Sequence, residues 1–358
     1  MPSLKEIKGR INSISSTLAI TSAMKMVAAA KLQKAQMAIQ NMLPYERRLY
    51  SMLVDLMGAM NISAAASEDG SVRGSGSAER GFDQSGDRLS LSNRHDLAGM
   101  DGAYSLMAQR EVRKVAIVAF ASNSSLCGAF NSNVIREATA VINEYRASGL
   151  GDADITVYSV GRKMAEAMKK LGFPSPADFT KMSDSPSYDA ASALAQELFD
   201  GFVSGRFDKV ELVYNHYKST SSQPTTRQTY LPLSLADAIA DLQAGKITDS
   251  ASETDTNKVA EPVGAPVVRQ GSPTTEDLIV EPSKEALIAT LLPKVVRLRI
   301  FTTLLDSAAA EHAARTVAMQ LATDNGNDLL QELTLEYNKG RQQKITSEIL
   351  DLVGGSMQ

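Results

Sequence analysis

Residues 307–355 read SAAAEHAARTVAMQLATDNGNDLLQELTLEYNKGRQQKITSEILDLVGG. Apolar side chains recur at steps of three and four residues in this stretch and just before it, which is the period of an α-helix. No proline occurs between Lys294 and Val353. At about 1.5 Å per residue, sixty helical residues reach roughly 90 Å, several times the ~13 Å radius of a compact hundred-residue domain. Such a helix must protrude. The recurring positions are Leu298, Phe301, Leu305, Ala308, Met319, Ala322, Leu330, Leu333, Tyr337, Ile345, Ile349 and Leu352.

One segment inside this stretch argues against a single helix. Thr323-Asp324-Asn325-Gly326-Asn327 has the composition of a helix C-cap followed by a turn. Periodicity alone therefore predicts two helices as readily as one.

The N-terminal residues predict a second long helix. Ser3-Leu4-Lys5-Glu6 is a capping box, in which the serine oxygen and the glutamate satisfy free amides at a helix start. A 3.5-residue apolar repeat follows over five heptads, which is typical of a left-handed coiled coil. The C-terminal helix is the other element long enough to cover this seam. The seam positions are Leu4, Ile7, Ile11, Ile14, Leu18, Thr21, Lys25, Ala28, Leu32, Ala35, Ile39 and Met42.

Pro44 marks a kink or break in the first helix, and residues 45–60 indicate a further amphipathic helix. Residues 61–108 are rich in Gly, Ser and charged side chains, so we expect a flexible insertion. A second flexible insertion is expected at 236–276, where Ser, Thr, Pro and acidic residues follow no period.

Strand and helix patterns alternate between these insertions, in residues 109–235. This alternation is typical of a mainly parallel sheet with helices on its faces. Strands are expected at 112–120, 155–160, 209–217 and 226–233, and helices at 131–145, 162–171 and 188–203.

The predicted fold is α+β with an α/β part: a long antiparallel coiled coil of the N- and C-terminal helices plus an inserted, Rossmann-like α/β domain. The predicted division is 1–60 for the N-terminal coiled-coil helix and the helix after it, 61–108, 109–235, 236–276, and 277–358 for the C-terminal coiled-coil helix.

Charge is unevenly distributed along the chain. The formal net charge is −4, yet residues 1–50 carry eight Lys or Arg residues against Glu6 and Glu46. The total therefore indicates no nucleic-acid partner, while one end of the molecule is basic. No apolar run approaches the ~18 residues that span a bilayer. The basic N-terminus has a second interpretation as a mitochondrial transit peptide, which its continuation into a long helix disfavours.

The sequence shows little catalytic chemistry. Cys127 lies in a strand-to-helix turn, where ligands of α/β proteins often bind, and a nucleophilic thiol is one interpretation. No histidine is paired with Cys127 by spacing, so a buried, inert cysteine is favoured. The turn lacks a phosphate-binding fingerprint, and three histidines with one cysteine give no metal constellation. We expect no cofactor.

Four stretches resemble the gamma-subunit family of F-type, proton-transporting ATP synthases of bacterial type. They are ITSAMKMVAAAK at 20–31, LCGAFN at 126–131, and AMQLATDN at 318–325 with LEYNKGRQQKIT at 335–346. The likeness covers most of the chain outside the two insertions. It implies one continuous C-terminal helix through 323–327.

The resemblance implies a non-catalytic central-stalk rotor shaft that couples proton flow through the c-ring to ATP synthesis or hydrolysis by rotation. The implied partners are the alpha and beta subunits of the catalytic hexamer, the epsilon subunit and the membrane c-ring. The implied location is peripheral, on the cytoplasmic face of the bacterial inner membrane, with no direct transmembrane insertion.

Matching motifs residue by residue carries over a set of contact positions. Met24 and Lys25, the pair Arg341 and Gln342, and the tip residues Ile349, Leu350, Leu352 and Val353 would meet the hexamer. Glu281 would face the c-ring.

Asn123-Ser124-Ser125 stand where the family commonly has charged residues and a glycine, so the resemblance carries over no charged contact at this turn. Two rival functions remain from the residues alone. One is a coiled-coil adaptor or scaffold unrelated to nucleotide hydrolysis, and the other is a thiol enzyme that uses Cys127.

Overall fold

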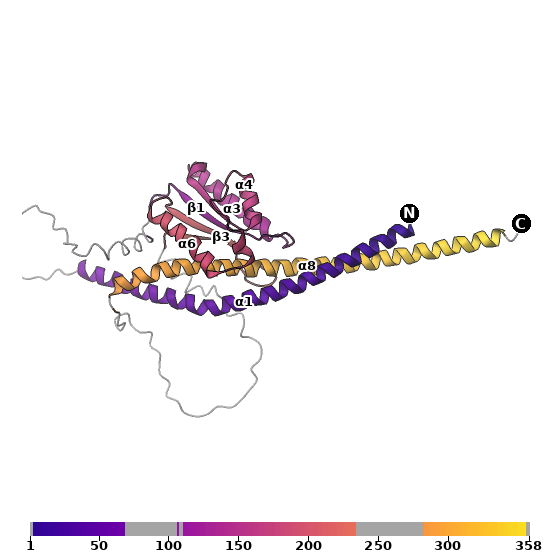
Figure 1. Cartoon of the computed structure of the whole chain (residues 1–358), viewed down its shortest axis with the longest axis horizontal. Coiled ribbons are helices and arrows are strands. Elements are labelled where there is room, and N and C mark those ends of the chain that lie inside the picture. Colours follow the sequence, from indigo (N-terminus) through magenta and orange to yellow (C-terminus); the bar gives the residue numbers. More distant parts are fainter. Residues whose placement is uncertain (1–2, 69–105, 107–109, 234–280, 282, 356–358) are drawn as a thin grey trace, which may run out of the picture.

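The computed structural model describes residues 3–68, 106, 110–233, 281 and 283–355. Two long helices and a four-stranded mixed sheet give an α+β architecture (Figure 1). The elements in chain order are α1 (Leu4–Glu68), β1 (Val115–Phe120), α3 (Phe130–Ala147), the 3-10 turn η1 (Asp152–Asp154), β2 (Ile155–Val160), α4 (Arg162–Lys170), α5 (Thr180–Asp184), α6 (Tyr188–Val203), β3 (Lys209–Asn215), β4 (Thr225–Leu231) and α8 (Lys284–Gly355).

The sheet has the order β2-β1-β3-β4. β1 pairs with β2 and β3 in parallel, and β3 pairs with β4 antiparallel, which confirms the mainly parallel sheet. β1 is buried on both faces because its residues alternate between two cores. Val115, Ile117 and Ala119 face one core, whereas Ala116, Val118 and Phe120 face the other.

Helices cover both faces of this sheet. α3 and α4 pack on one face around residues such as Val134, Ile142 and Met164. α6, the C-terminal part of α1 and the N-terminal part of α8 pack on the other, through residues such as Leu53, Leu198 and Val295. The same long helices that leave the domain therefore also form its second core.

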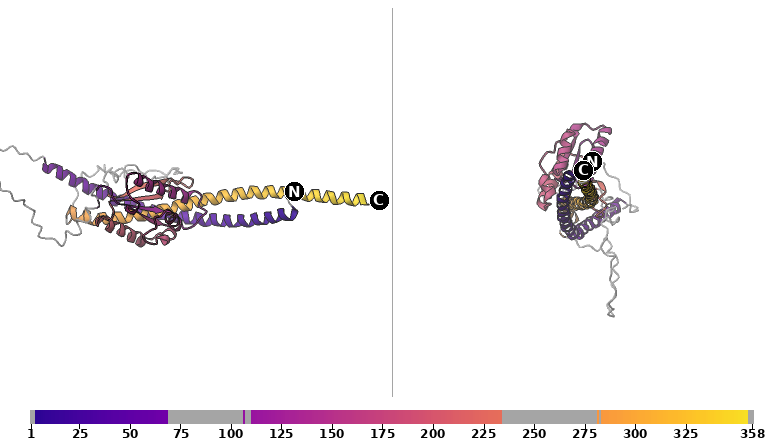
Figure 2. Two further views of the ribbon diagram at one scale, coloured as in Figure 1. Left: turned by 90° about the horizontal axis from the view of Figure 1, so that it is seen from above. Right: turned by 90° about the vertical axis from the view of Figure 1, so that its right-hand side faces the viewer.

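α1 and α8 lie antiparallel and form a rod (Figures 1 and 2). Three interhelical hydrogen bonds fix the direction. Arg299 donates to the Tyr50 hydroxyl at 3.0 Å, Thr302 to Glu46 at 3.1 Å, and Thr323 to Thr21 at 3.2 Å. Residue numbers rise along one helix as they fall along the other, so both termini lie at the same end, as the figures show.

The predicted seam of α1 faces inward. Every seam position from Leu4 to Met42 is buried or half-buried, including the weak positions Thr21 and Lys25. The apolar repeat therefore identified the face of α1 that packs on its partner.

α8 is continuous through 323–327, so the turn interpretation of this segment is wrong. A Cβ atom on Gly326 would lie 2.6 Å from Cδ2 of Leu18. The glycine thus serves a close approach between the two helices and does not end one. Thr323 also donates to the carbonyl of Met319, as helical threonines do.

α1 passes through Pro44 to Glu68 as one helix, whereas the sequence indicated a kink or break at Pro44, a separate helix at 45–60 and an insertion from 61. Proline removes one backbone donor, and packing beyond it holds the helix because Leu49, Tyr50, Leu53 and Leu56 are buried in the domain core. α8 likewise runs through Pro293.

The two expected insertions fall largely outside the described residues. Of the segment 61–108, the structure describes 61–68, which are helical, and residue 106. Leu106 is fully buried in the domain core, and its carbonyl accepts from the Leu233 amide. The segment 236–276 lies outside the described residues.

Candidate partner-binding site

The C-terminal end of α8 extends beyond the start of α1 (Figure 2). α1 begins at Leu4, opposite Gly340, where an added Cβ would lie 3.1 Å from Cδ2 of Leu4. Beyond that point α8 has no partner helix among the described residues, and residues 341–350 are all exposed. The tip is therefore a single helix.

The end of this tip carries exposed apolar side chains. Ile349 is 54% exposed, Leu350 65%, Leu352 74% and Val353 50%. Arg341 and Gln342 are exposed where the single helix begins. Clustered exposed apolar side chains at the end of a projecting helix indicate a surface that another protein covers.

Met24 and Lys25 lie in the first third of α1, near the middle of the rod, and are half-buried. Their neighbours on the outer face are more open: Ile20 is 60% exposed, Met26 65% and Val27 58%. The structure therefore adds these three residues to the candidate contact surface. Ile20, Met26 and Val27 fall outside the 3.5-residue seam, and apolar residues outside a seam are the sequence signal of a second contact surface.

The matching part of α8 also exposes apolar residues. Leu321, Leu329 and Leu335 are 58%, 45% and 65% exposed. The helix pair thus buries one stripe of each helix and leaves a second apolar set open to a partner.

Glu281 is exposed in a bend just before α8, at the end of that helix opposite the tip. The residues predicted from sequence therefore form three separate groups: the middle of the rod, its tip and its base. They line an extended surface and do not meet in one pocket.

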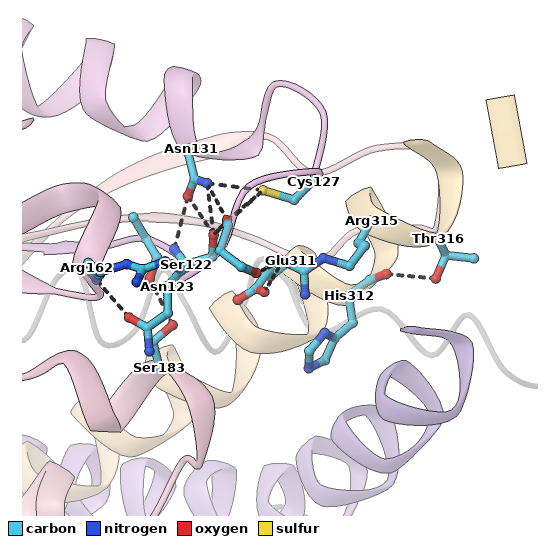
Figure 3. A network of polar contacts seen from close by, with 12 residues as sticks. Ser122, Asn123, Cys127, Asn131, Arg162, Ser183, Glu311, His312, Arg315 and Thr316 are labelled. Carbon is cyan, nitrogen blue, oxygen red and sulfur yellow. Dashed lines mark hydrogen bonds and ion pairs between the residues drawn. The ribbon is translucent and has the colours of Figure 1, made fainter. Parts of the chain in front are cut away.

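The domain touches the rod at the turn between β1 and α3 (Figure 3). Arg315 of α8 donates to the Ser124 hydroxyl at 2.7 Å and pairs with Glu311 at 2.7 Å. Ser122 is fully buried. The side chain of Asn131 accepts a hydrogen bond from the Ser122 amide and donates one to the Ser122 hydroxyl. Ser124 is one of the departures from the family pattern, and here it receives an arginine of the rod.

Two titratable groups at this junction have shifted pKa values. Burial raises the pKa of Glu311, and the facing Arg315 opposes that shift. Burial, with Arg315 and Lys31 nearby, lowers the pKa of His312 to about 4. Within the described part of the chain, His312 Nδ1 is buried without a hydrogen-bond partner. His312 is therefore a neutral imidazole at neutral pH.

Cys127 is 1% exposed and accepts a hydrogen bond from Asn131 Nδ2 at 3.2 Å. Its other polar contacts are with Ser122 and Ser124, and the His312 ring points away from it (Figure 3). This environment fits the inert, packed cysteine better than a nucleophile.

Among the described residues, no group of three or more His, Cys, Asp and Glu side chains is placed to hold a metal ion. In the same residues, no helix has the length and apolar character that crossing a membrane requires.

Comparison with known proteins gives one consistent result. The family model described as ATP synthase matches residues 3–357. The chain is 47% identical over 357 residues to the ATP synthase gamma chain of Phocaeicola vulgatus, with 100% of both chains covered. It is 35% identical over 356 residues to the ATP synthase gamma chain of Flavobacterium psychrophilum, covering 99% of this chain and 98% of that one.

Solved structures share the fold. A chain of the Euglena gracilis mitochondrial ATP synthase OSCP/F1/c-ring assembly in rotational state 3 aligns with a TM-score of 0.52 and 18% identity, covering 99% of this chain and 93% of that one. A chain of the rotor of the same enzyme in rotational state 1 gives a TM-score of 0.51 at 18% identity, covering 96% and 98%.

Proposed function

Since this chain belongs to the ATP synthase gamma-chain family, we propose that it is the central-stalk rotor shaft of a membrane ATP synthase. In this role it couples proton flow through the c-ring to ATP synthesis or hydrolysis in the catalytic hexamer by rotating within it.

One observation supports this role above the others: a helix pair projects from the domain and ends in a single helix with exposed apolar side chains. Leu352 and Leu350 at that end are 74% and 65% exposed. Water-exposed leucines at the end of a rod favour a surrounding protein, because covering each one contributes about 1.5–3 kcal/mol. A ring of subunits around the tip supplies such cover.

The finer fold assignment belongs to this proposal. We infer that the paired part of α1 and α8 is a left-handed coiled coil and that the domain is Rossmann-like. The inward-facing 3.5-residue seam of α1 supports the first, and the parallel order β2-β1-β3 supports the second.

The proposed mechanism needs no bond chemistry in this chain. An asymmetric shaft meets the catalytic subunits of a hexamer through different side chains at any one moment. Each orientation then favours a different conformation in each subunit, and rotation converts differential contact into differential nucleotide affinity. The chain is thus a non-catalytic subunit.

The proposed contacts with the alpha and beta subunits are Met24 and Lys25 at mid-rod, Arg341 and Gln342 at the start of the tip, and Ile349 and Leu352 near its end. The basic N-terminal helix suits an acidic partner segment. Glu281 is proposed to face the c-ring, with the epsilon subunit beside the domain. The complex holds the chain peripherally at the cytoplasmic face of the inner membrane, without nucleic acid and without inserting this chain into the bilayer.

Affinity isolation of the tagged chain from its native host tests this function. The expected result is one copy of the chain with a hexameric ATPase. Purification without a nucleotide-hydrolysing partner would support the adaptor alternative and reject the shaft.

A truncation after Lys344 tests the tip. The isolated chain should unfold at an unchanged temperature, because residues 341–350 are exposed in the described structure. Assembly or the coupling of ATP hydrolysis to proton pumping should weaken. Leu352→Ser should do the same in part, whereas Glu348→Ser, which breaks only an exposed 3.8 Å ion pair with Lys344, should not.

A further inference from the structure

We infer that Gln36, Tyr217 and Asp306 form a polar clamp that fixes the angle between the α/β domain and the rod. Gln36 lies on α1, Asp306 on α8, and Tyr217 in the connection between β3 and β4. The inference rests on the proposed shaft function, for which these would be positioning residues: a domain that swivels on its rod transmits less of a rotation.

Asp306 holds the domain with both of its carboxylate oxygens. Oδ1 accepts from the Tyr217 amide at 2.9 Å, and Oδ2 lies 2.6 Å from Nδ1 of His216. The Asp306 side chain is 19% exposed, so water competes weakly for these bonds. Two bonds from one carboxylate to adjacent residues restrict rotation about either bond.

Tyr217 joins this contact to the second helix. Its hydroxyl accepts from Nε2 of Gln36 at 2.6 Å. Its ring packs against two small apolar clusters, one with Leu32 and Ala309 and the other with Phe130 and Ala310. A single side chain therefore contacts α1, α8 and the start of α3.

Hydrogen bonds set the geometry at this level of the rod because the apolar contacts there are small. The surrounding α8 residues are the alanines Ala309, Ala310, Ala313 and Ala314. Alanine buries little area, and apolar burial does not depend on direction. Hydrogen bonds weaken steeply when misaligned, so they resist a change of angle.

The large apolar contact between domain and rod lies nearer the base, where residues 49–56 of α1 and 288–304 of α8 join the domain core. These apolar contacts hold the domain against the rod but set the angle between them only loosely, because apolar burial does not depend on direction. The clamp adds directional hydrogen bonds at Asp306, just past Leu304, and the Arg315–Ser124 hydrogen bond lies further along the rod.

The clamp also leads directly into the sheet. Asn215, the last residue of β3, donates to the Phe130 carbonyl at 3.1 Å and accepts from Thr225 of β4 at 2.7 Å. The His216 amide donates to the Pro224 carbonyl at 2.9 Å. Tyr217 is thus held by β3, which pairs with β1 and β4, and a load on it passes to both neighbouring strands.

Spin-label distance measurements on the full chain test the clamp without reference to ATP. Labels are placed at two exposed positions, Lys169→Cys in α4 and Asp328→Cys in α8. Cys127 stays in place because it is 1% exposed, and the chain without added cysteines should take up no label.

Tyr217→Phe removes one hydroxyl and should increase the fraction of molecules outside the main distance peak about 2- to 12-fold, the factor expected for one lost hydrogen bond. Asp306→Ala removes two bonds and should increase it further. The matched control is Tyr145→Phe, which removes a hydroxyl that donates to Glu211 at 2.6 Å inside the domain. It should leave the distribution unchanged. A distribution in Tyr217→Phe equal to that of the control would overturn the clamp.

The second measurement is made on the assembled ATP synthase in inverted vesicles. Tyr217→Phe should lower the number of protons pumped per ATP hydrolysed relative to the control, at equal amounts of assembled complex. A broadened distribution with unchanged pumping would reject the positioning role. Failure of the unmodified chain to assemble with a hexamer would reject the shaft function itself, while the distance measurement still decides the clamp.

Discussion

His312 is a buried titratable side chain of the rod. Its pKa is lowered to about 4 by burial and by the positive charges of Arg315 and Lys31. The unfolded chain binds this proton near the ordinary value of about 6.5, so between these two pH values the unfolded state holds more protons than the folded one. The contribution of neutral His312 to the free energy of unfolding is therefore fully present above about pH 6.5 and is lost as the pH falls towards 4.

We predict that His312→Gln reduces the loss of stability on acidification. Between pH 7 and 5, the free energy of unfolding should fall by about 1–2 kcal/mol less than in the unmodified chain, after allowance for solvent screening. Chemical denaturation at both pH values measures this. Glu311, whose pKa is raised, acts in the opposite sense, so Glu311→Gln serves as the control and should steepen the loss. Equal pH dependence in His312→Gln and the unmodified chain would contradict the prediction.

Gly161 is a second residue whose role is local. Its φ angle is +96°, and a Cβ atom there would lie 2.0 Å from the carbonyl oxygen of Ala121. We expect Gly161→Ala to lower the free energy of unfolding by about 2 kcal/mol or more, because backbone would have to move. Gly172→Ala is the control for φ alone, since φ is +91° there and no atom lies within 4 Å. Thermal unfolding of the two variants separates close contact from backbone strain.

At the scale of the element, α1 has two apolar faces with different tasks. Leu32 is 7% exposed and packs against α8, whereas Val27 is 58% exposed on the outer face. We predict that Leu32→Ala lowers the free energy of unfolding by about 2–5 kcal/mol. Val27→Ala should change it by less than about 0.5 kcal/mol yet weaken association with the catalytic hexamer.

Denaturation of the isolated chain and pull-down of the hexamer measure these two effects separately. The assignment of the faces is wrong if Val27→Ala destabilises the isolated chain as much as Leu32→Ala.

The sequence predicted most elements because their signals are local. The seam of α1 follows from its 3.5-residue apolar repeat, and the strand expected at 155–160 and the helix expected at 188–203 match β2 and α6. The passage of α1 through Pro44 was missed because the burial that sustains it comes from residues distant in sequence. Periodicity also did not decide whether α8 continues through Gly326. The close approach of Leu18 explains the glycine, and it is visible only in the structure.

The candidate site divides in the same way. The tip residues Ile349 and Leu352 were identified through the family resemblance, and the structure shows them exposed; that they contact the hexamer stays a prediction. His216 was noted only as an isolated histidine, because its partner Asp306 lies 90 residues further along the chain. No spacing rule links two such positions.

At the scale of the whole molecule, the chain combines a compact domain with a rod. α8 alone has 72 residues, which corresponds to roughly 110 Å of helix. A compact protein of 358 residues would have a radius of gyration of about 21 Å. We predict a clearly larger value and a maximum dimension above about 100 Å in small-angle X-ray scattering. The truncation after Lys344 should shorten the maximum dimension, and a radius near 21 Å would contradict the rod.

α8 is at once a wall of the domain core and the outermost tip, and one continuous helix joins them. Torque applied at the base is therefore transmitted by the pair of helices α1 and α8 as far as Gly340, and by α8 alone beyond it. A single helix is less stiff in torsion than a pair, so under the same torque α8 past Gly340 twists through a larger angle per residue and stores more elastic energy than the paired part.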